Sequence, residues 1–160
     1  MFVDELTIYA QAGRGGNGVE RWLRERSRPF GGPAGGDGGK GGDVYFRAVR
    51  NINELAQYTG VKEFRAQSGA AGQGHSRHGR SGADLIIDVP IGTTAIRCRG
   101  EQPCDTAATH RNETADDVYE LLTEGETTPV LRGGHGGLGN ETFKSSTNRS
   151  PRETTKGKEG

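Results

Sequence analysis

The stretch GGPAGGDGGKGGD, Gly31 to Asp43, decides the fold, because eight of its thirteen residues are glycine and the glycines come in pairs. A spacing of three recurs from Gly133, where the sequence reads GGHGGLG. A polyproline II helix has three residues per turn and no internal hydrogen bonds, so a Gly-Gly-X repeat leaves two of its faces without side chains. We therefore expect several such helices to pack side by side and to exchange the hydrogen bonds that their buried amides need.

Two other interpretations of the glycine compete with this one. Flexible linkers are glycine-rich, but a linker requires no period, whereas the glycine runs of this chain share one. Phosphate-binding loops are the second alternative. Windows of the form G-x-G-x-x-G begin at Gly13, Gly36 and Gly134, yet none has the strand, helix and later acidic residue of a dinucleotide fold.

The residues around Lys40 do not form a Walker-type loop. That motif needs glycine five residues before its second glycine and Ser or Thr after the lysine, and this chain has Ala34 and Gly41 there. Without the hydroxyl there is no magnesium ligand. We expect no nucleoside triphosphate to bind through this run.

The segments between the glycine runs predict strands. Alternating apolar residues occur in LTIYA (6–10), DVYFRAV (43–49) and DLIIDVPIG (84–92), and shorter candidates are KEFRA, TTAIR and TPVLR. The segment TADDVYELLTE (114–124) fits a capped helix or a strand equally well. Short strands without a long helix predict a mainly β fold, as a small sandwich or barrel.

Charge is balanced overall but not locally. The chain has 21 basic and 21 acidic side chains, yet residues 14–28 and 62–80 each carry a net charge of +3 and residues 101–126 carry −7. We therefore expect a basic end and an acidic end.

The cysteines and the lack of a long apolar run indicate a cytoplasmic protein. Cys98 and Cys104 are too few for a disulfide scaffold or a four-cysteine metal site, so we expect reduced thiols. No apolar run is long enough to span a membrane. The polar tail from Lys144 is expected to be disordered or to begin a further part of the protein.

The chain resembles the N-terminal domain of the Obg family of GTPases. The resemblance rests on GGPAGGDGGKGGDV (31–44), MFVDELTIYAQAGRGGNG (1–18), HGRSGADLIIDVPIGT (78–93) and LRGGHGGLGNETF (131–143), in the family's order. It implies a glycine-rich Obg fold over residues 1–143, with a small β-barrel-like base and projecting left-handed polyproline II type helices. Residues 144–160 would then begin the missing remainder.

The resemblance also implies a function. Members of the family bind the large ribosomal subunit during its maturation, and their GTP and magnesium sites lie in a later G domain whose motifs these 160 residues lack. This chain would then be the ribosome-binding part of a longer GTPase, monomeric and without a catalytic residue or cofactor of its own.

If the glycine helices project, the turns that join them should carry the residues that contact ribosomal RNA, because Arg and Lys neutralise phosphate. Asp37 and His135, at X positions of the repeat, are expected to be exposed spacers. The candidate RNA contacts are Arg24, Arg26, Arg28, Lys40, His75, Arg77, His78 and Arg80. The structural glycines are Gly15, Gly16, Gly18, Gly35, Gly36, Gly38, Gly39, Gly133, Gly134, Gly136 and Gly137.

Two further function classes compete with RNA binding. An enzyme is disfavoured, since the sequence contains no evident nucleophile and base, metal-ligand cluster or paired carboxylates, and His75 with His78 is a weak metal candidate. A protein-interaction module that uses the acidic residues 101–126 to bind a basic ribosomal protein or a stress regulator stays open as the alternative.

Overall fold

The computed structural model describes residues 3–27, 29, 31–61, 63–98 and 115–160. The chain divides into two compact units. We call them the strand unit, which comprises residues 1–9, 46–62 and 86–128, and the glycine unit, which comprises residues 10–45, 63–85 and 129–160.

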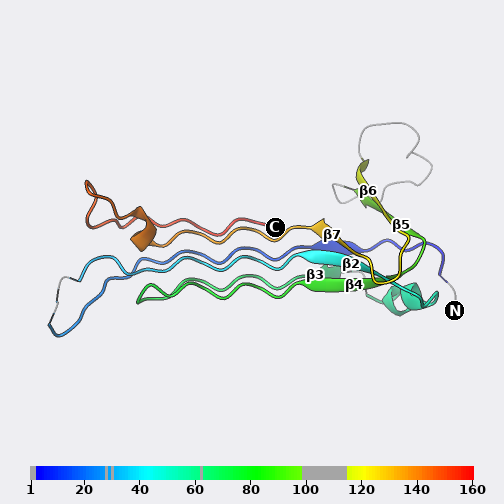
Figure 1. The fold of residues 1–160 in the computed structure, drawn as a ribbon, viewed down its shortest axis with the longest axis horizontal. Coiled ribbons are helices and arrows are strands. Elements are labelled where there is room, and N and C mark those ends of the chain that lie inside the picture. The colour runs from blue at the N-terminus through cyan, green and yellow to red at the C-terminus, as the bar shows by residue number, and fades with distance from the viewer. Residues whose placement is uncertain (1–2, 28, 30, 62, 99–114) are drawn as a thin grey trace. The chain divides into compact units, whose positions relative to one another are not determined.

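The described part of the chain is mainly β, as the sequence predicts (Figure 1). Its strands form three separate sheets, with the orders β1-β3, β4-β2-β7 and β5-β6, and none of these sheets closes into a barrel. Two short 3-10 helices accompany them, η1 (Glu54–Tyr58) and η3 (Asn140–Phe143). The strands are β1 (Tyr9–Gln11), β2 (Val44–Val49), β3 (Glu63–Arg65), β4 (Leu85–Pro90), β5 (Thr93–Cys98), β6 (Ala115–Leu121) and β7 (Thr127–Leu131).

The core of the strand unit follows the predicted period of two. Phe46 and Ala48 of β2 and Ile87 and Val89 of β4 are buried, and Leu121 at the end of β6 is fully buried. Alternate residues of a strand point to opposite faces, so this spacing gathers the apolar side chains on one face.

The structure shortens one expected strand and decides one ambiguous segment. The first strand is limited to Tyr9–Gln11 and does not cover residues 6–8. The segment 114–124 contains a strand, β6, which pairs with β5 in antiparallel register from Thr93↔Leu121 onward. Cross-strand pairing outweighs the helical spacing of a few apolar residues in this segment.

Cys98 is disulfide-bonded, so the expectation of a reduced thiol is wrong for this residue. The number of cysteines argues against a scaffold of several disulfides, but it does not exclude a single bond. Cys104 lies outside the described residues.

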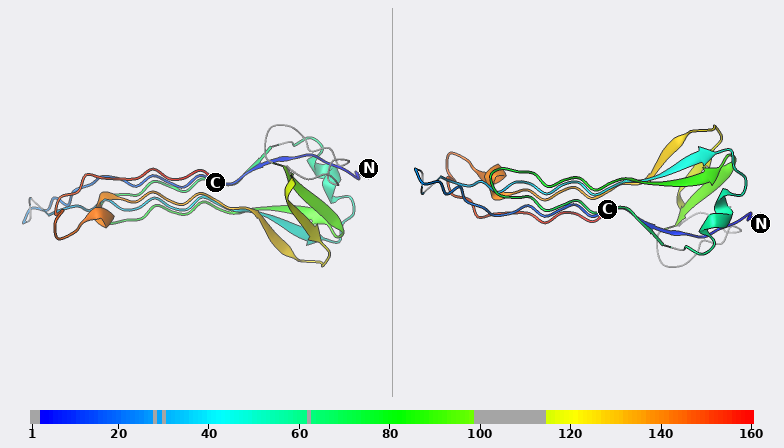
Figure 2. Two further views of the ribbon diagram at one scale, coloured as in Figure 1. Left: turned by 90° about the horizontal axis from the view of Figure 1, so that it is seen from above. Right: turned by 90° about the horizontal axis from the view of Figure 1, so that it is seen from below.

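The glycine unit contains extended segments without strand or helix assignment that run side by side, as the views in Figures 1 and 2 agree. Backbone hydrogen bonds between segments hold them together. We call these six segments, in chain order, the glycine bundle: residues 12–19, 35–42, 66–73, 77–84, 132–139 and 151–160.

Backbone hydrogen bonds join the first three segments of the bundle in a cycle, from the first to the second, from the second to the third, and from the third back to the first. Gly16 N–H donates to Gly39 O (2.8 Å), Gly39 N–H donates to Ala70 O (2.8 Å), and Gly69 N–H donates to Arg14 O (2.8 Å). The pattern recurs at intervals of three residues. Such a period of lateral bonds is what polyproline II geometry requires, although the left-handed helix itself stays a prediction.

Glycine is required in the bundle because neighbouring backbones touch. In the second segment, the first glycine of each triplet faces the first segment and the second glycine faces the fourth. A Cβ added to Gly38 would lie 2.0 Å from Gly16 O, and one added to Gly36 would lie 2.0 Å from Arg77 O. At all eleven structural glycines named from the sequence, an added Cβ would lie within 2.2 Å of a backbone oxygen of another segment.

The polar tail supplies the sixth segment, so the structure contradicts disorder for residues 151–160. Thr155 N–H donates to Leu138 O (3.0 Å), and Lys158 N–H donates to His135 O (2.9 Å). On its other side, Lys158 O accepts a hydrogen bond from Gly15 N–H (2.9 Å). The tail lacks apolar residues for a core of its own, but its backbone bonds to two other segments of the bundle.

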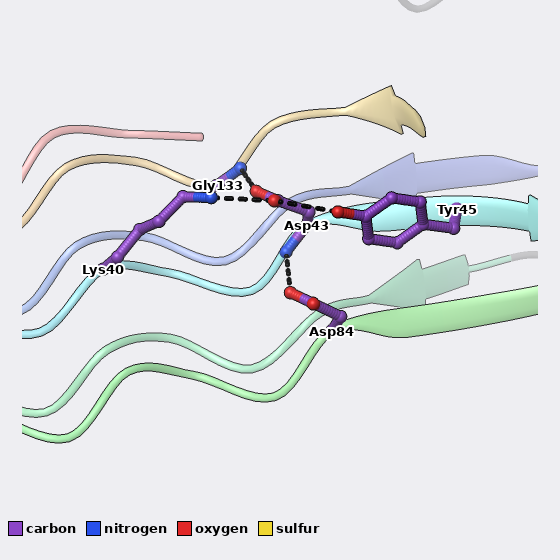
Figure 3. A network of polar contacts seen from close by, with 5 residues as sticks. All are labelled: Lys40, Asp43, Tyr45, Asp84 and Gly133. Atoms are coloured by element: carbon purple, nitrogen blue, oxygen red, sulfur yellow. Dashed lines mark hydrogen bonds and ion pairs between the residues drawn. The ribbon is translucent and has the colours of Figure 1, made fainter. Parts of the chain in front are cut away.

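A polar network ties the glycine segments together where they lead into strands (Figure 3). The carboxylate of Asp43 accepts hydrogen bonds from Lys40 Nζ (2.7 Å), Gly133 N–H (2.6 Å) and the Tyr45 hydroxyl (3.3 Å), while Asp43 N–H donates to Asp84 (2.8 Å). The hydrogen bond from Lys40 lowers the pKa of the Asp43 carboxyl and raises the pKa of the Lys40 ammonium. Asp43 therefore serves as a charged acceptor that fixes the segment containing Gly133.

Adding a methyl group at Gly36 tests the packing of the bundle. Gly36→Ala should lower the free energy of unfolding by about 3 kcal/mol or more, because backbone atoms must shift to admit the Cβ. Gly60→Ala is the matched control, since a Cβ there meets nothing within 4 Å, and should change stability by less than about 1 kcal/mol. Thermal unfolding measures both, and equal midpoints for the two variants would contradict backbone contact at Gly36.

Asp43→Asn tests the charge of the network. A carboxyl whose pKa is lowered by folding stabilises the native state above its unfolded pKa of about 4 and loses that contribution as the pH falls through the folded pKa. Asp43→Asn should therefore unfold at a lower temperature than wild type at neutral pH, and the gap should shrink on acidification. Glu124→Gln, at an exposed pair with Arg50, is the control. A gap that does not change with pH would show that the charge of Asp43 contributes nothing.

Candidate nucleic-acid interface

The first turn, residues 20–34, joins the first two segments of the bundle. Trp22 pairs with Pro33 in antiparallel fashion, and Leu23 N–H donates to Gly32 O (2.9 Å). Gly32 has a φ of 85°, a conformation that glycine adopts without steric cost. The two stems of the turn are therefore held together by backbone pairing.

Three of the candidate RNA contacts belong to this turn. Arg24 and Arg26 follow the paired stem and are exposed. Arg28 lies outside the described residues. The turn thus presents at least two guanidinium groups to solvent.

The second turn, residues 74–76, is strained. His75 and Ser76 have φ values of 60° and 57°, in the left-handed region that residues with a side chain adopt at a cost. Ser76 N–H donates to Ala34 O (2.9 Å), which attaches this turn to the end of the first one. His75 and the following Arg77 are exposed.

A third turn, residues 140–150, is not expected at the interface from the sequence. It begins with η3 and carries Lys144 and Arg149, and Arg152 follows it; all three are exposed. Residues 144–152 contain basic residues but no acidic residue, and this local excess of positive charge is the sequence feature that could have indicated a nucleic-acid contact here. Because the sequence predicts disorder or a further domain here, it does not assign this charge to the same end as the other turns.

The three turns lie at the same end of the glycine unit (Figures 1 and 2). The side chain of Asn140, in the third turn, accepts a hydrogen bond from Gly35 N–H (2.8 Å) and donates one to Arg21 O (3.1 Å), both at the stem of the first turn. Basic side chains that are far apart in the sequence are therefore gathered at one end of the unit, which we call the basic end.

Arginines at the basic end are available for a ligand. Within the part of the chain that the structure describes, no carboxylate forms an ion pair with Arg24, Arg26 or Arg77. Elsewhere in the bundle, by contrast, Arg14 is paired with Glu159 (3.3 Å). Exposed guanidinium groups without an acidic partner keep their donors free for phosphate oxygens.

Lys40 and Arg80 lie in the interior of segments of the bundle, so the expected placement in a turn is wrong for them. Arg77 and His78 are the first two residues of the fourth segment and directly follow the second turn. The Lys40 ammonium binds Asp43 and belongs to the polar network described above. Arg80 lies within the fourth segment, where its carbonyl accepts a hydrogen bond from Ala70 N–H (2.8 Å). The glycine-rich segments are long enough that Lys40 and Arg80 each lie several positions away from the nearest turn. Contact of these two side chains with RNA stays a prediction.

Asp37 is not a spacer, contrary to expectation. Its Oδ1 accepts hydrogen bonds from Gly139 N–H (2.7 Å) and the Thr142 hydroxyl (2.9 Å), and its Oδ2 lies 3.6 Å from Nδ1 of His78. Asp37 therefore connects its own segment with the fourth and fifth segments and with the third turn. His135, the other expected spacer, is exposed.

Neither a metal cluster nor a membrane-spanning helix occurs among the described residues. No group of three His, Cys, Asp or Glu side chains in that part of the chain is arranged to hold a metal ion. No helix there has the length and apolar character needed to cross a membrane.

Known proteins resemble this chain over nearly its whole length. The family model described as GTP1/OBG matches residues 3–160. A GTPase Obg of Pelagibacter ubique (strain HTCC1062) is 45% identical to this chain over 159 residues, which cover 99% of this chain and 44% of that relative. The chain thus spans less than half the length of this relative. With nearly all of its residues matched by the family model, the chain belongs to the GTP1/OBG family.

Proposed function

We propose that this chain is the ribosome-binding N-terminal domain of an Obg-type GTPase that acts in assembly of the large ribosomal subunit, and that its basic end contacts ribosomal RNA. The gathering of exposed, unpaired arginines from separate turns at one end of the bundle carries this proposal. Arginine neutralises phosphate and stacks on unpaired bases, the features by which proteins recognise folded RNA.

The bundle suits this role because it positions the turns without bulky side chains. Its segments are joined by backbone hydrogen bonds at intervals of three residues, and its glycines leave no room for a Cβ. A ligand site on such a support loses little conformational entropy on binding, since its backbone is already ordered.

The remaining chemistry would lie outside this chain. GTP and magnesium would bind in a further G domain, and the whole protein would act in the cytoplasm as a monomer. Family membership supports this division, because the chain corresponds to less than half of a GTPase Obg.

An interaction with a basic protein is the second candidate function, and the β5-β6 sheet favours it. Val118 in β6 and Leu122 directly after it are 53% and 68% exposed. Glu120 lies between them in the alternating pattern and is also exposed. An apolar patch beside an acidic side chain suits a cationic, partly apolar protein segment and repels nucleic acid.

Removing charge from the basic end tests RNA binding. Arg24→Gln, Arg26→Gln and Arg77→Gln together should weaken binding to purified large subunits, and the dependence of log affinity on log salt should become shallower by about 0.7 to 0.9 for each lost phosphate contact. Arg50→Gln in the strand unit is the control for loss of charge.

Two outcomes would count against RNA contact at the basic end. Unchanged affinity and slope in the triple variant would refute it. Loss of binding on Glu120→Gln with Val118→Asn, but not in the triple variant, would favour the protein-interaction alternative.

Two substitutions in the second turn distinguish an effect on stability from an effect on RNA contact, because His75 and Ser76 both have a positive φ but only His75 is a candidate contact. His75→Gly and Ser76→Gly should each stabilise the fold by about 0.5 to 1 kcal/mol, because glycine accepts a positive φ. Only His75→Gly should weaken binding to large subunits, since it removes a proposed contact. Thermal unfolding and binding titrations measure the two effects, and equal binding by both variants would remove His75 from the contact surface.

A further inference from the structure

Asn140 is a polar residue with no exposure to solvent, and its side-chain amide is fully used. Oδ1 accepts hydrogen bonds from Gly35 N–H (2.8 Å) and Arg21 N–H (3.4 Å). Nδ2 donates to Arg21 O (3.1 Å) and Pro151 O (3.2 Å). One side chain thereby satisfies four backbone groups that belong to three different stretches of the chain.

These four groups lie at the stems of the basic turns. Arg21 lies at the start of the first turn and Gly35 directly follows that turn, while Asn140 begins the third turn and Pro151 directly follows it. The second turn joins the same cluster through the hydrogen bond from Ser76 N–H to the residue before Gly35. The amide of Asn140 therefore fixes the spacing of turns that carry the basic side chains of this end.

Neither a carboxylate nor an aliphatic side chain reproduces this arrangement. A carboxylate at the position would accept from Gly35 N–H but would meet the carbonyls of Arg21 and Pro151 with repulsion. An alanine would leave buried donors and acceptors unsatisfied. The amide supplies one acceptor and one donating group in a fixed plane, and both are used.

We infer that Asn140 is the positioning residue of the basic end, which sets how many phosphates its turns engage at once. This role rests on the proposed RNA-binding function and belongs to a residue that carries no charge and has no exposure to solvent. Because affinity depends on salt in proportion to the number of phosphates neutralised together, an uncharged residue that aligns the turns controls the salt dependence.

Two charge-neutral variants, Asn140→Ala and Asn140→Thr, test this role in binding to purified large subunits across a range of salt concentrations. We expect affinity to fall about tenfold and the slope of log affinity against log salt to become shallower by about 1, the loss of one phosphate contact. Partial unfolding would only reduce the active fraction, which lowers binding by a constant factor and leaves the slope unchanged. Binding is measured at a temperature at which circular dichroism of the variant matches wild type.

Ile87→Ala is the control, because Ile87 is buried in β4 of the strand unit and its truncation destabilises the chain without altering the turns. It should retain the wild-type slope. If wild type binds and both Asn140 variants keep its slope, the positioning role is overturned; if neither variant folds at any temperature, Asn140 serves the fold alone and the role is also overturned. If wild type itself does not bind, the proposed function fails and not merely the role of Asn140.

Discussion

Backbone amides in the glycine unit must find partners in other segments, because a chain with a period of three has no hydrogen bonds of its own. This requirement governs the rest of the unit. Segments must approach until N–H and C=O groups meet, so an added Cβ at Gly36 or Gly38 would lie 2.0 Å from a neighbouring backbone oxygen. Each segment is held by others that are distant in sequence, and even the polar tail becomes ordered through such bonds.

The same requirement decides where side chains can be used. In the Gly-Gly-X segments, only the X positions have room for side chains. The turns that join the segments also have room for them. Asp37 and Asp43 occupy X positions, and their carboxylates accept hydrogen bonds from Gly139 N–H and Gly133 N–H. Acidic side chains thus supplement the backbone hydrogen bonds at these two X positions, whereas the exposed Arg24 and Arg26 lie in the first turn.

The sequence predicts those features that depend on local period. Alternation of apolar residues predicts β2 and β4, and the Gly-Gly-X spacing predicts close lateral packing and the first two turns of the basic end. It does not predict that Asp37 and Lys40 are engaged by partners, because those partners depend on how the segments meet. The third turn and the order of residues 151–160 are missed for the same reason, since a segment without apolar residues carries no local sign that it will bond to its neighbours.

Binding by a small number of charges requires that their positions be set before the ligand arrives, since every turn that must be ordered on binding lowers affinity. If the three turns were independent loops, each would lose conformational entropy separately when its arginines bind a ligand. In this chain the stems of the turns share hydrogen bonds, through Ser76 with Ala34 and through Asn140 with Arg21 and Gly35. The turns are therefore ordered already when the chain folds, and little further conformational entropy is lost on binding. The left-handed backbone of the second turn lowers stability when considered alone, whereas the buried amide of Asn140 makes all of its hydrogen bonds and makes its surroundings rigid. Both features fix the relative positions of the exposed charges on which the proposed RNA contact depends.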